Sequence, residues 1–332
     1  MNPTISDLHV SSALTDISVA YAQQPSVFVA PVAFPTVPVS KQADKYFIYD
    51  AGDWFRTEAK PRAPGAPIAM GGWKLSTSNY FCDRFGLGHP ISDPERANAD
   101  PAVSNLDADA SEYLTHQLML KDEVDWVASF FATGVWIGAS STTDMTGAAA
   151  PASTATGFLQ WNDVASTPIE DIDGESVTIQ QRTGQKPNTL IVGPQVWVNL
   201  KNHPDILDRI KYTEKGIVTQ DLVAALLDLD RVMVAAAVQN SANEGAADSF
   251  GFIAGKAALL CYVPPSPGLK VPAAGYRFSW TGSAGAPANG VGARVKRYRD
   301  EPRESDVVEA ETWRDFKVIG SSLGAFFTSA VA

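Results

Sequence analysis

Residues 106–131 read LDADASEYLTHQLMLKDEVDWVASFF, and the pattern of this stretch predicts one long helix. Acidic residues occupy its first turns and Gly134 follows its end, as is typical of helix boundaries. At about 1.5 Å per residue the helix would span about 40 Å, long enough to form the spine of a domain. Apolar side chains recur in it at helical spacing, at Leu106, Ala110, Tyr113, Leu114, Leu120, Val124, Val127 and Phe131.

The segment before this helix is unlike a folded domain. A short apolar stripe over residues 10–22 is followed by prolines at positions 25, 31, 35 and 38. Because each proline lacks a backbone N–H and fixes φ, we expect an extended arm that cannot join a central sheet. The arm is apolar, so it must wrap either its own body or a neighbouring subunit. We predict contacts with a neighbouring subunit at Val27, Phe28 and Phe34.

Residues 45–82 predict one long hairpin. Residues 46–49 and 73–78 have the composition of strands, and the segment between them is rich in proline and glycine and carries charges of both signs. A two-stranded ribbon is marginally stable alone in water, so this one needs another surface to lie on. A solvated, charged loop is the alternative interpretation. For a docked hairpin, the predicted contact residues are Arg56, Glu58, Lys60, Arg62 and Trp73.

The rest of the chain alternates helices and strands and indicates an α+β protein. Thr167-Pro168-Ile169-Glu170 predicts a capping box that opens a helix ending near Gly184. Thr219 is expected to cap a further helix. The remaining expected elements are helical turns at 195–202 and 204–210 and strands at 190–192, 232–236, 258–263, 276–281, 293–299 and 313–319.

Composition and charge exclude several classes of protein. The chain has 332 residues, with 26 Lys and Arg against 37 Asp and Glu, which gives a net charge of −11 and argues against a protein that neutralises nucleic acid over its whole surface. Cys82 and Cys261 lie too far apart for a zinc or redox motif. No signal peptide and no apolar run approaching about 20 residues are visible, which predicts folding in a cytoplasm and no membrane partner.

The sequence shows no complete catalytic or metal-binding motif, and we predict no catalytic residue, no metal site and no cofactor. Residues 320–324, GSSLG, match a nucleophile elbow, but the eight residues that follow contain no histidine. Residues 251–257 resemble a phosphate-binding loop with a glycine spacing that is one residue short. The four histidines lie in unrelated segments. This pattern favours a structural protein over an enzyme.

Four stretches of the chain share a resemblance to one family. Residues 34–50, FPTVPVSKQADKYFIYD, resemble the junction of arm and hairpin in the major capsid proteins of tailed bacteriophages. The further matching stretches are DPERANAD at 93–100, PNTLIVG at 187–193 and LKNHPDILDRIKY at 200–212. They occur in the family's order from about residue 10 to residue 265, and they are specific as a set rather than singly.

The resemblance implies the Hong Kong 97-type capsid fold. Its parts are an N-terminal arm, an extended hairpin, a peripheral domain with a long spine helix, and an axial domain that meets its copies at the fivefold and sixfold centres. The implied boundaries are residues 1–44 for the arm, 45–82 for the hairpin, 83–184 for the peripheral domain with its spine helix at 104–133, 185–290 for the axial domain and 291–332 for a return to the peripheral domain.

The function implied by the resemblance is self-assembly into the icosahedral head shell that encloses the double-stranded DNA of a tailed phage. The expected partners are further copies of the chain as hexamers and pentamers, a portal, a decoration protein and a scaffolding protein, which we expect to be separate because the chain starts directly with the arm. The expected location is the virion, after assembly in the host bacterial cytoplasm. An encapsulin-like nanocompartment shell is the alternative, and an α/β hydrolase is a more distant one.

A basic cluster near the C-terminus qualifies the acidic net charge. Arg294, Arg297 and Arg299 alternate along a predicted strand with Lys296, and Arg303 follows. We interpret this cluster as a strip of ion pairs between subunits, with a DNA-binding site as the alternative. On this interpretation an acidic subunit encloses DNA with weak, non-specific contacts only.

Overall fold

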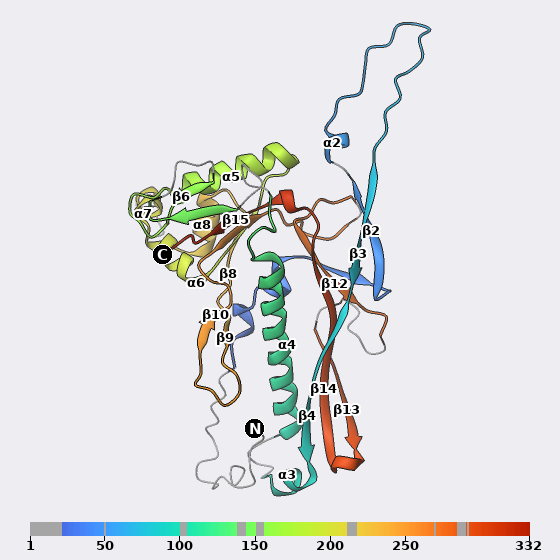
Figure 1. The fold of residues 1–332 in the computed structure, drawn as a ribbon, viewed down its shortest axis with the longest axis vertical. Coiled ribbons are helices and arrows are strands. Elements are labelled where there is room, and N and C mark those ends of the chain that lie inside the picture. Colours follow the sequence, from blue (N-terminus) through green and yellow to red (C-terminus); the bar gives the residue numbers. More distant parts are fainter. Residues whose placement is uncertain are drawn as a thin grey trace.

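The computed structural model of the chain describes residues 22–49, 51–99, 105–137, 144–150, 156–210, 218–268, 270–283, 290 and 292–332. A long central helix is flanked on one side by long strands and on the other by a smaller unit of helices around a sheet, and a hairpin projects beyond both (Figure 1). The apolar stripe predicted at 10–22 lies outside the described residues, apart from Ala22.

The predicted spine helix is confirmed as α4 (Leu106–Phe130). Its cap is Asn105, whose side chain accepts a hydrogen bond from the backbone N–H of Ala108. The predicted apolar face is partly wrong, because Tyr113 is exposed and Val124 is only half-buried. The buried face instead follows a spacing of four residues that includes two acidic groups, at Ala110, Leu114, Leu118, Asp122, Glu123, Trp126 and Phe130.

A five-stranded sheet lies along this helix. Its central strand is β14 (Ser305–Val318), which pairs antiparallel with β4 (Asp83–Ser92), β13 (Arg294–Asp300) and β12 (Gly275–Trp280). Apolar side chains of α4, β4 and β14 form the core between helix and sheet. The connecting elements are α3 (Asp93–Asn98), with a capping box from Ser92 to Glu95, and the 3-10 turn η4 (Glu301–Arg303).

The arm joins this sheet at its edge. β1 (Thr36–Val39) pairs parallel with β12, and Pro38 lies opposite Ser279. The expectation that the prolines keep the arm out of a sheet is therefore wrong in part: an edge strand tolerates a missing N–H, because only one of its sides is paired. The arm is also not extended throughout, since it contains η3 (Pro25–Val27) and the one-turn helix α1 (Ala30–Ala33).

A six-stranded sheet forms the core of the smaller unit, in the order β6-β5-β15-β11-β7-β8. β11 is antiparallel to both of its neighbours, and the other pairs are parallel. These strands span Met145–Ala148 (β5), Gly157–Leu159 (β6), Thr189–Val192 (β7), Arg231–Val234 (β8), Ala258–Cys261 (β11) and Gly324–Thr328 (β15).

Helices cover this sheet at nearly the predicted positions: α5 (Pro168–Thr183), α6 (Pro194–Asn202), α7 (Pro204–Ile210) and α8 (Gln220–Leu226). Thr219 caps α8 as predicted. Gly184 ends α5 as predicted, with a positive φ of 67°. The predicted capping box of α5 is wrong, because the Thr167 side chain makes no capping hydrogen bond; Pro168 alone marks the start.

Pairing between distant segments crosses the expected domain boundaries. β12 belongs to the segment expected to be axial, yet it pairs in the sheet along α4. Conversely β5, β6 and β15 were expected in the peripheral domain and lie in the six-stranded sheet. β15 follows η5 (Ser321–Leu323) inside the nucleophile-elbow match, so this match leads into a strand and not a helix.

Two hairpins lie outside the two main sheets. The predicted long hairpin is confirmed as β2 (Ala43–Tyr49) and β3 (Leu75–Phe81), with α2 (Ala51–Trp54) after its first strand. A short hairpin of β9 (Val238–Asn240) and β10 (Phe250–Phe252) was not predicted. Within the described ranges, no helix combines the length and the apolar character needed to cross a bilayer.

Candidate functional site

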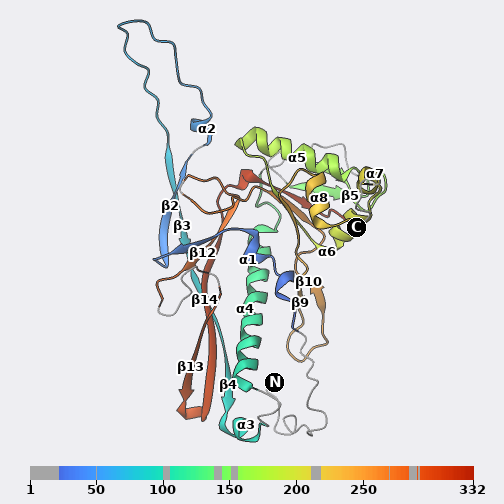
Figure 2. The ribbon, with the colours of Figure 1, turned by 180° about the vertical axis from the view of Figure 1, so that it is seen from behind.

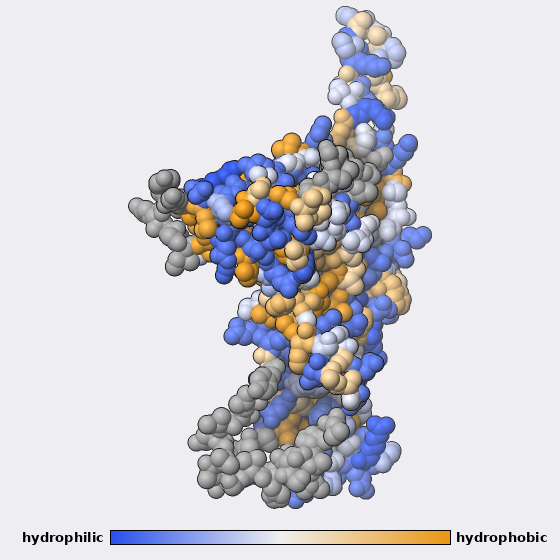
Figure 3. Space-filling view, turned by 60° about the vertical axis from the view of Figure 1, so that its left-hand side comes forward, coloured by the Kyte–Doolittle hydropathy of each residue, from blue (hydrophilic) through white to orange (hydrophobic). Residues whose placement is uncertain are grey.

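The long hairpin carries apolar side chains that its own subunit leaves exposed. Trp54 and Trp73 are 55% and 65% exposed, and their ring centroids lie 6.3 Å apart. Tyr49 packs edge-on against Trp54 at 6.2 Å. We call Tyr49, Trp54 and Trp73 the aromatic cluster. Figure 3 shows the outer part of the hairpin standing clear of the rest of the surface, and the exposed fractions of Trp54 and Trp73 leave much of the aromatic cluster available to another molecule.

The charged residues predicted on the hairpin tip remain solvent-exposed. Arg56 lies 3.8 Å from Asp53, and Asp53 also accepts a hydrogen bond from the backbone N–H of Lys74. Glu58, Lys60 and Arg62 are exposed. Trp54 was not singled out from the sequence, although it follows Asp53 directly at a point where an exposed tryptophan would be unusual in a solvated loop. The aromatic cluster and these charged residues together form an exposed surface of mixed apolar and charged side chains along the hairpin.

The arm residues have a different position from the one predicted. Phe28 and Phe34 are 3% and 2% exposed and lie in the subunit's own core. Phe34 packs against Phe130 at 4.5 Å and against Trp126 at 6.3 Å. Val27 is half-buried. In this structure Phe28 and Phe34 therefore offer no surface to a neighbouring subunit, because the spine helix already covers them.

Buried charges of the spine helix connect it to the sheet. Asp122 accepts a hydrogen bond from Arg277 of β12 at 2.8 Å and pairs with Arg314 of β14. Arg314 also binds Asp125 at 2.9 Å, and its guanidinium stacks over Phe85 at 4.3 Å. Burial raises the pKa of Asp122, and the two arginines oppose that shift. A sequence signal existed: Asp122 occupies an apolar position in the series 114, 118, 122, 126 and 130.

The basic strand finds its partners inside the subunit. Arg294 binds Glu311 at 2.5 Å, and Arg297 lies 3.2 Å from Asp107. Arg299 donates to the two carboxylate oxygens of Asp93 through its two terminal nitrogens, Nη1 and Nη2. These ion pairs lie within the subunit, and the strip of ion pairs between subunits stays a prediction. The acids that neutralise these arginines lie on β14, on α3 and on α4. The acids of α3 and α4 are far from β13 in the sequence.

Glu311 is the centre of this network of charges. Its side chain is fully buried and receives Arg84, Arg294 and Lys296. Burial alone would raise the pKa of Glu311, but its hydrogen bonds with Glu309 and with the three cations lower it to about 2. The carboxylate is therefore ionised at neutral pH and holds three cations on the sheet.

Ser166 and His203 are the pair of side chains that most resembles a nucleophile with its base, but His203 has the wrong tautomer for that role. The hydroxyl of Ser166 lies 3.0 Å from His203 Nε2, but His203 Nδ1 accepts the backbone N–H of Asp205. Nε2 therefore carries the proton, so it cannot accept one from Ser166, which itself donates to the carbonyl of Asp163. In the part of the chain that the structure describes, no group of three or more His, Cys, Asp or Glu could hold a metal ion.

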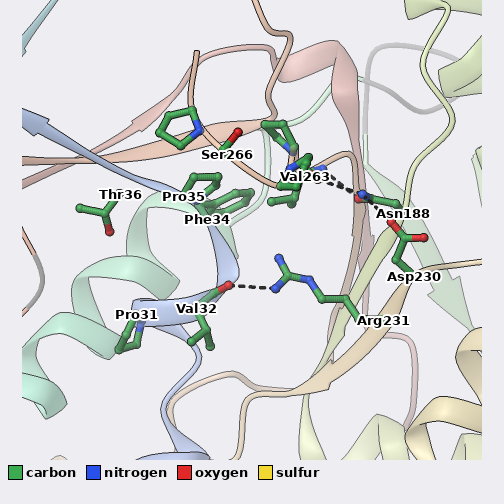
Figure 4. A pocket seen from close by; sticks show the side chains of 13 residues that line it. Pro31, Val32, Phe34, Pro35, Thr36, Asn188, Asp230, Arg231, Val263 and Ser266 are labelled. Carbon is green, nitrogen blue, oxygen red and sulfur yellow. Dashed lines mark hydrogen bonds between the residues drawn. The ribbon is translucent and has the colours of Figure 1, made fainter. Parts of the chain in front are cut away.

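A surface hollow of about 610 Å³ lies where the arm crosses the smaller unit (Figure 4). Its walls come from residues 31–36 of the arm and from residues 263–267, and five prolines line it. The charged residues among its lining are Asp230 and Arg231. Arg231 points at the arm and donates to the carbonyl of Val32 at 3.1 Å, so the charge serves the fold. Two adjacent charges of opposite sign make no catalytic set.

Comparisons with known proteins found relatives in sequence and neighbours in fold. No family model matches the chain. The major capsid protein of Burkholderia phage BcepMu is 26% identical over 260 residues, which cover 77% of this chain and 76% of that protein. A phage-related protein from Bordetella bronchiseptica has a TM-score of 0.66 at 21% identity and 93% coverage of both chains. The capsid of cyanophage P-SCSP1u has a TM-score of 0.60 at 9% identity, with 98% and 94% covered.

The fold is therefore the Hong Kong 97-type capsid fold, as the sequence resemblance implied. The holo-SrpI encapsulin complex from Synechococcus elongatus has the fold as well, with a TM-score of 0.51 at 9% identity. At that identity the likeness concerns the fold alone. The two sequence relatives at 26% identity, from Burkholderia phage BcepMu and Pseudomonas phage JBD67, are both phage major capsid proteins.

Proposed function

We propose that this chain, a relative of phage major capsid proteins with their fold, assembles with copies of itself into the icosahedral head shell of a tailed phage. The observation that carries the proposal is the projecting hairpin with its exposed aromatic cluster, on a chain with these relatives. A subunit that ends its folding with such a surface still uncovered gains free energy when a neighbour covers it.

The hairpin is the contact that the subunit cannot complete alone. Its strands form a ladder of seven residue pairs from Ala43↔Phe81 to Tyr49↔Leu75, and beyond that ladder the chain has no sheet to lie on within the described subunit. Apolar side chains extend along it from Phe47 to Met70. We assign this apolar and charged surface, with Arg56, Glu58, Lys60, Arg62 and Trp73, to docking on an adjacent subunit.

We assign each element to a domain by the sheet that it belongs to or covers, and not by contiguous ranges of the sequence. We assign the peripheral domain to α4 and the five-stranded sheet, and the axial domain to the six-stranded sheet with α5 to α8. The axial domain then includes β5, β6 and the C-terminal β15. In hexamers and pentamers this unit would face its copies around the symmetry axis.

The remaining partners follow from the role of a head shell. A scaffolding protein, a portal and a decoration protein would bind the subunit or the shell, and the packaged double-stranded DNA would touch the inner wall weakly. The charge of −11 supports weak contact, and the neutralised arginines of β13 support it further. The role is structural, without catalysis, and its place is the virion after assembly in the host cytoplasm.

Electron microscopy of the purified full chain tests the proposal. We expect closed icosahedral particles in negative stain at micromolar subunit concentration, alone or with a scaffolding protein from the same phage. Particles that co-purify with an enzyme cargo in place of DNA would favour the nanocompartment. A monomer that persists at high concentration under both conditions would contradict the proposal.

A further inference from the structure

The arm has no charged or titratable side chain between residues 22 and 40, yet polar groups from both units hold its backbone. At its start, the backbone N–H of Gln23 donates to His116 of α4, and the Gln23 side chain makes two hydrogen bonds with the backbone of Val238. At the end of α1, Arg231 donates to the carbonyls of Val32 and Ala33 at 3.1 and 2.8 Å. The arm is thus fastened to the spine helix and to the smaller unit.

The fastening at the start of α1 has an unusual chemistry. Glu123 of α4 is fully buried, and its Oε2 accepts the backbone N–H groups of Val29 and Ala30, each at 2.8 Å. Its other oxygen, Oε1, is buried and has no hydrogen-bond partner within the described residues. Figure 2 shows α1 lying against the upper part of α4, where this contact forms. No cation within the described residues pairs with this carboxylate, unlike that of Asp122 beside it.

We propose that Glu123 is a proton-dependent clasp that fastens the arm to the spine helix. A proton on Oε1 removes a buried charge that no cation compensates, while Oε2 still accepts both amides, so covering this side chain with the arm costs less free energy when it is protonated. Burial raises the pKa of Glu123 to about 7, the two amides oppose this shift, and Asp122 adds to it. Because this pKa lies above that of an exposed glutamate, docking of the arm weakens as pH rises from about 4.5 through 7.

The surrounding charges leave this sign unchanged. On α4 itself Glu123 has Asp122 and His116 as titratable neighbours; Arg277 of β12 and Arg314 of β14 bind Asp122, and Arg231 of β8 binds the far end of α1. His116 holds the start of the arm through its hydrogen bond with the backbone N–H of Gln23 and not through Glu123.

Hydrogen–deuterium exchange of the purified full chain tests the clasp. The readout is the protection of the amides of residues 27–34, corrected for the intrinsic pH dependence of exchange and compared with peptides from the middle of α4. For wild type we expect the protection of the arm to fall about 30-fold between pH 5.5 and 8.5, as a shift of this pKa from about 4.5 to about 7 requires. Glu123→Gln keeps an acceptor oxygen without the charge, and we expect protection that no longer depends on pH.

The matched control is Glu112→Gln, which removes an exposed acid from the same helix and should retain the wild-type profile. A flat profile in wild type, or an unchanged pH dependence in Glu123→Gln, would overturn the proposal. Protection that falls with acid would overturn it equally. The wild-type profile decides even if the variant fails to fold, and neither result depends on whether the chain forms shells.

Discussion

Trp73→Ala tests the hairpin as a docking surface. Trp73 is 65% exposed, so with a tryptophan surface of about 250 Å² it has roughly 160 Å² left to bury on a neighbour. At about 25 cal/mol per Å² this corresponds to at most about 4 kcal/mol per contact. Partial burial in the contact lowers the loss to about 2–4 kcal/mol, which raises the subunit concentration needed for assembly roughly 30- to 700-fold.

The assay is a titration of subunit concentration, with particles counted in negative stain and the free subunit measured by sedimentation velocity. Thermal unfolding of the free subunit should stay within about 0.5 kcal/mol of wild type, because an exposed side chain contributes little to the fold. Lys74→Gln, next to it on the same hairpin, is the matched control and should shift assembly by less than about 1 kcal/mol. Assembly of Trp73→Ala at the wild-type concentration would contradict the assignment of Trp73 to a contact between subunits.

Three further predictions concern the subunit itself. Phe34→Ala removes a fully buried ring from the arm and should lower the free energy of unfolding by about 3–5 kcal/mol in urea, whereas an unchanged midpoint would mean that the arm is not docked in solution. Asp122→Asn leaves Arg277 and Arg314 buried without their shared charge and should cost about 3–5 kcal/mol, against less than about 1 kcal/mol for the exposed control Asp109→Asn. Glu311 has a pKa of about 2, below its ordinary value of 4.5, so the stability that its ionised form contributes is present above pH 4.5 and lost as pH falls toward 2; thermal unfolding across this window should show a steeper loss in wild type than in Glu311→Gln.

Individual helices, turns and the long hairpin could be predicted from patterns of neighbouring residues in the sequence. The spine helix, the long hairpin, the helices at 194–202 and 204–210 and the cap at Thr219 all depend on residues within a few positions of one another. Propensity, periodicity and turn chemistry act at that range, and the order of these elements was enough to carry a resemblance to a capsid family.

The errors arose wherever a charge was buried or a strand found a distant partner. The predicted apolar face of the spine helix was partly wrong because it contained apolar positions only, whereas the buried face includes Asp122 and Glu123. Their partners, Arg277 and Arg314 for one and the arm's amides for the other, lie 93 or more positions away. No local pattern contains that information.

Composition and local patterns were enough to identify an acidic α+β chain with an apolar arm, a long hairpin and one long helix, without a recognisable catalytic motif. Which apolar surfaces remain exposed could be seen only in the folded chain. It buries Phe28 and Phe34 of the arm against α4, pairs the arginines of β13 within the subunit, and leaves the aromatic cluster of the hairpin uncovered. The physical reason is that exposure depends on which distant segments meet, whereas hydrophobicity and charge are properties of each residue alone.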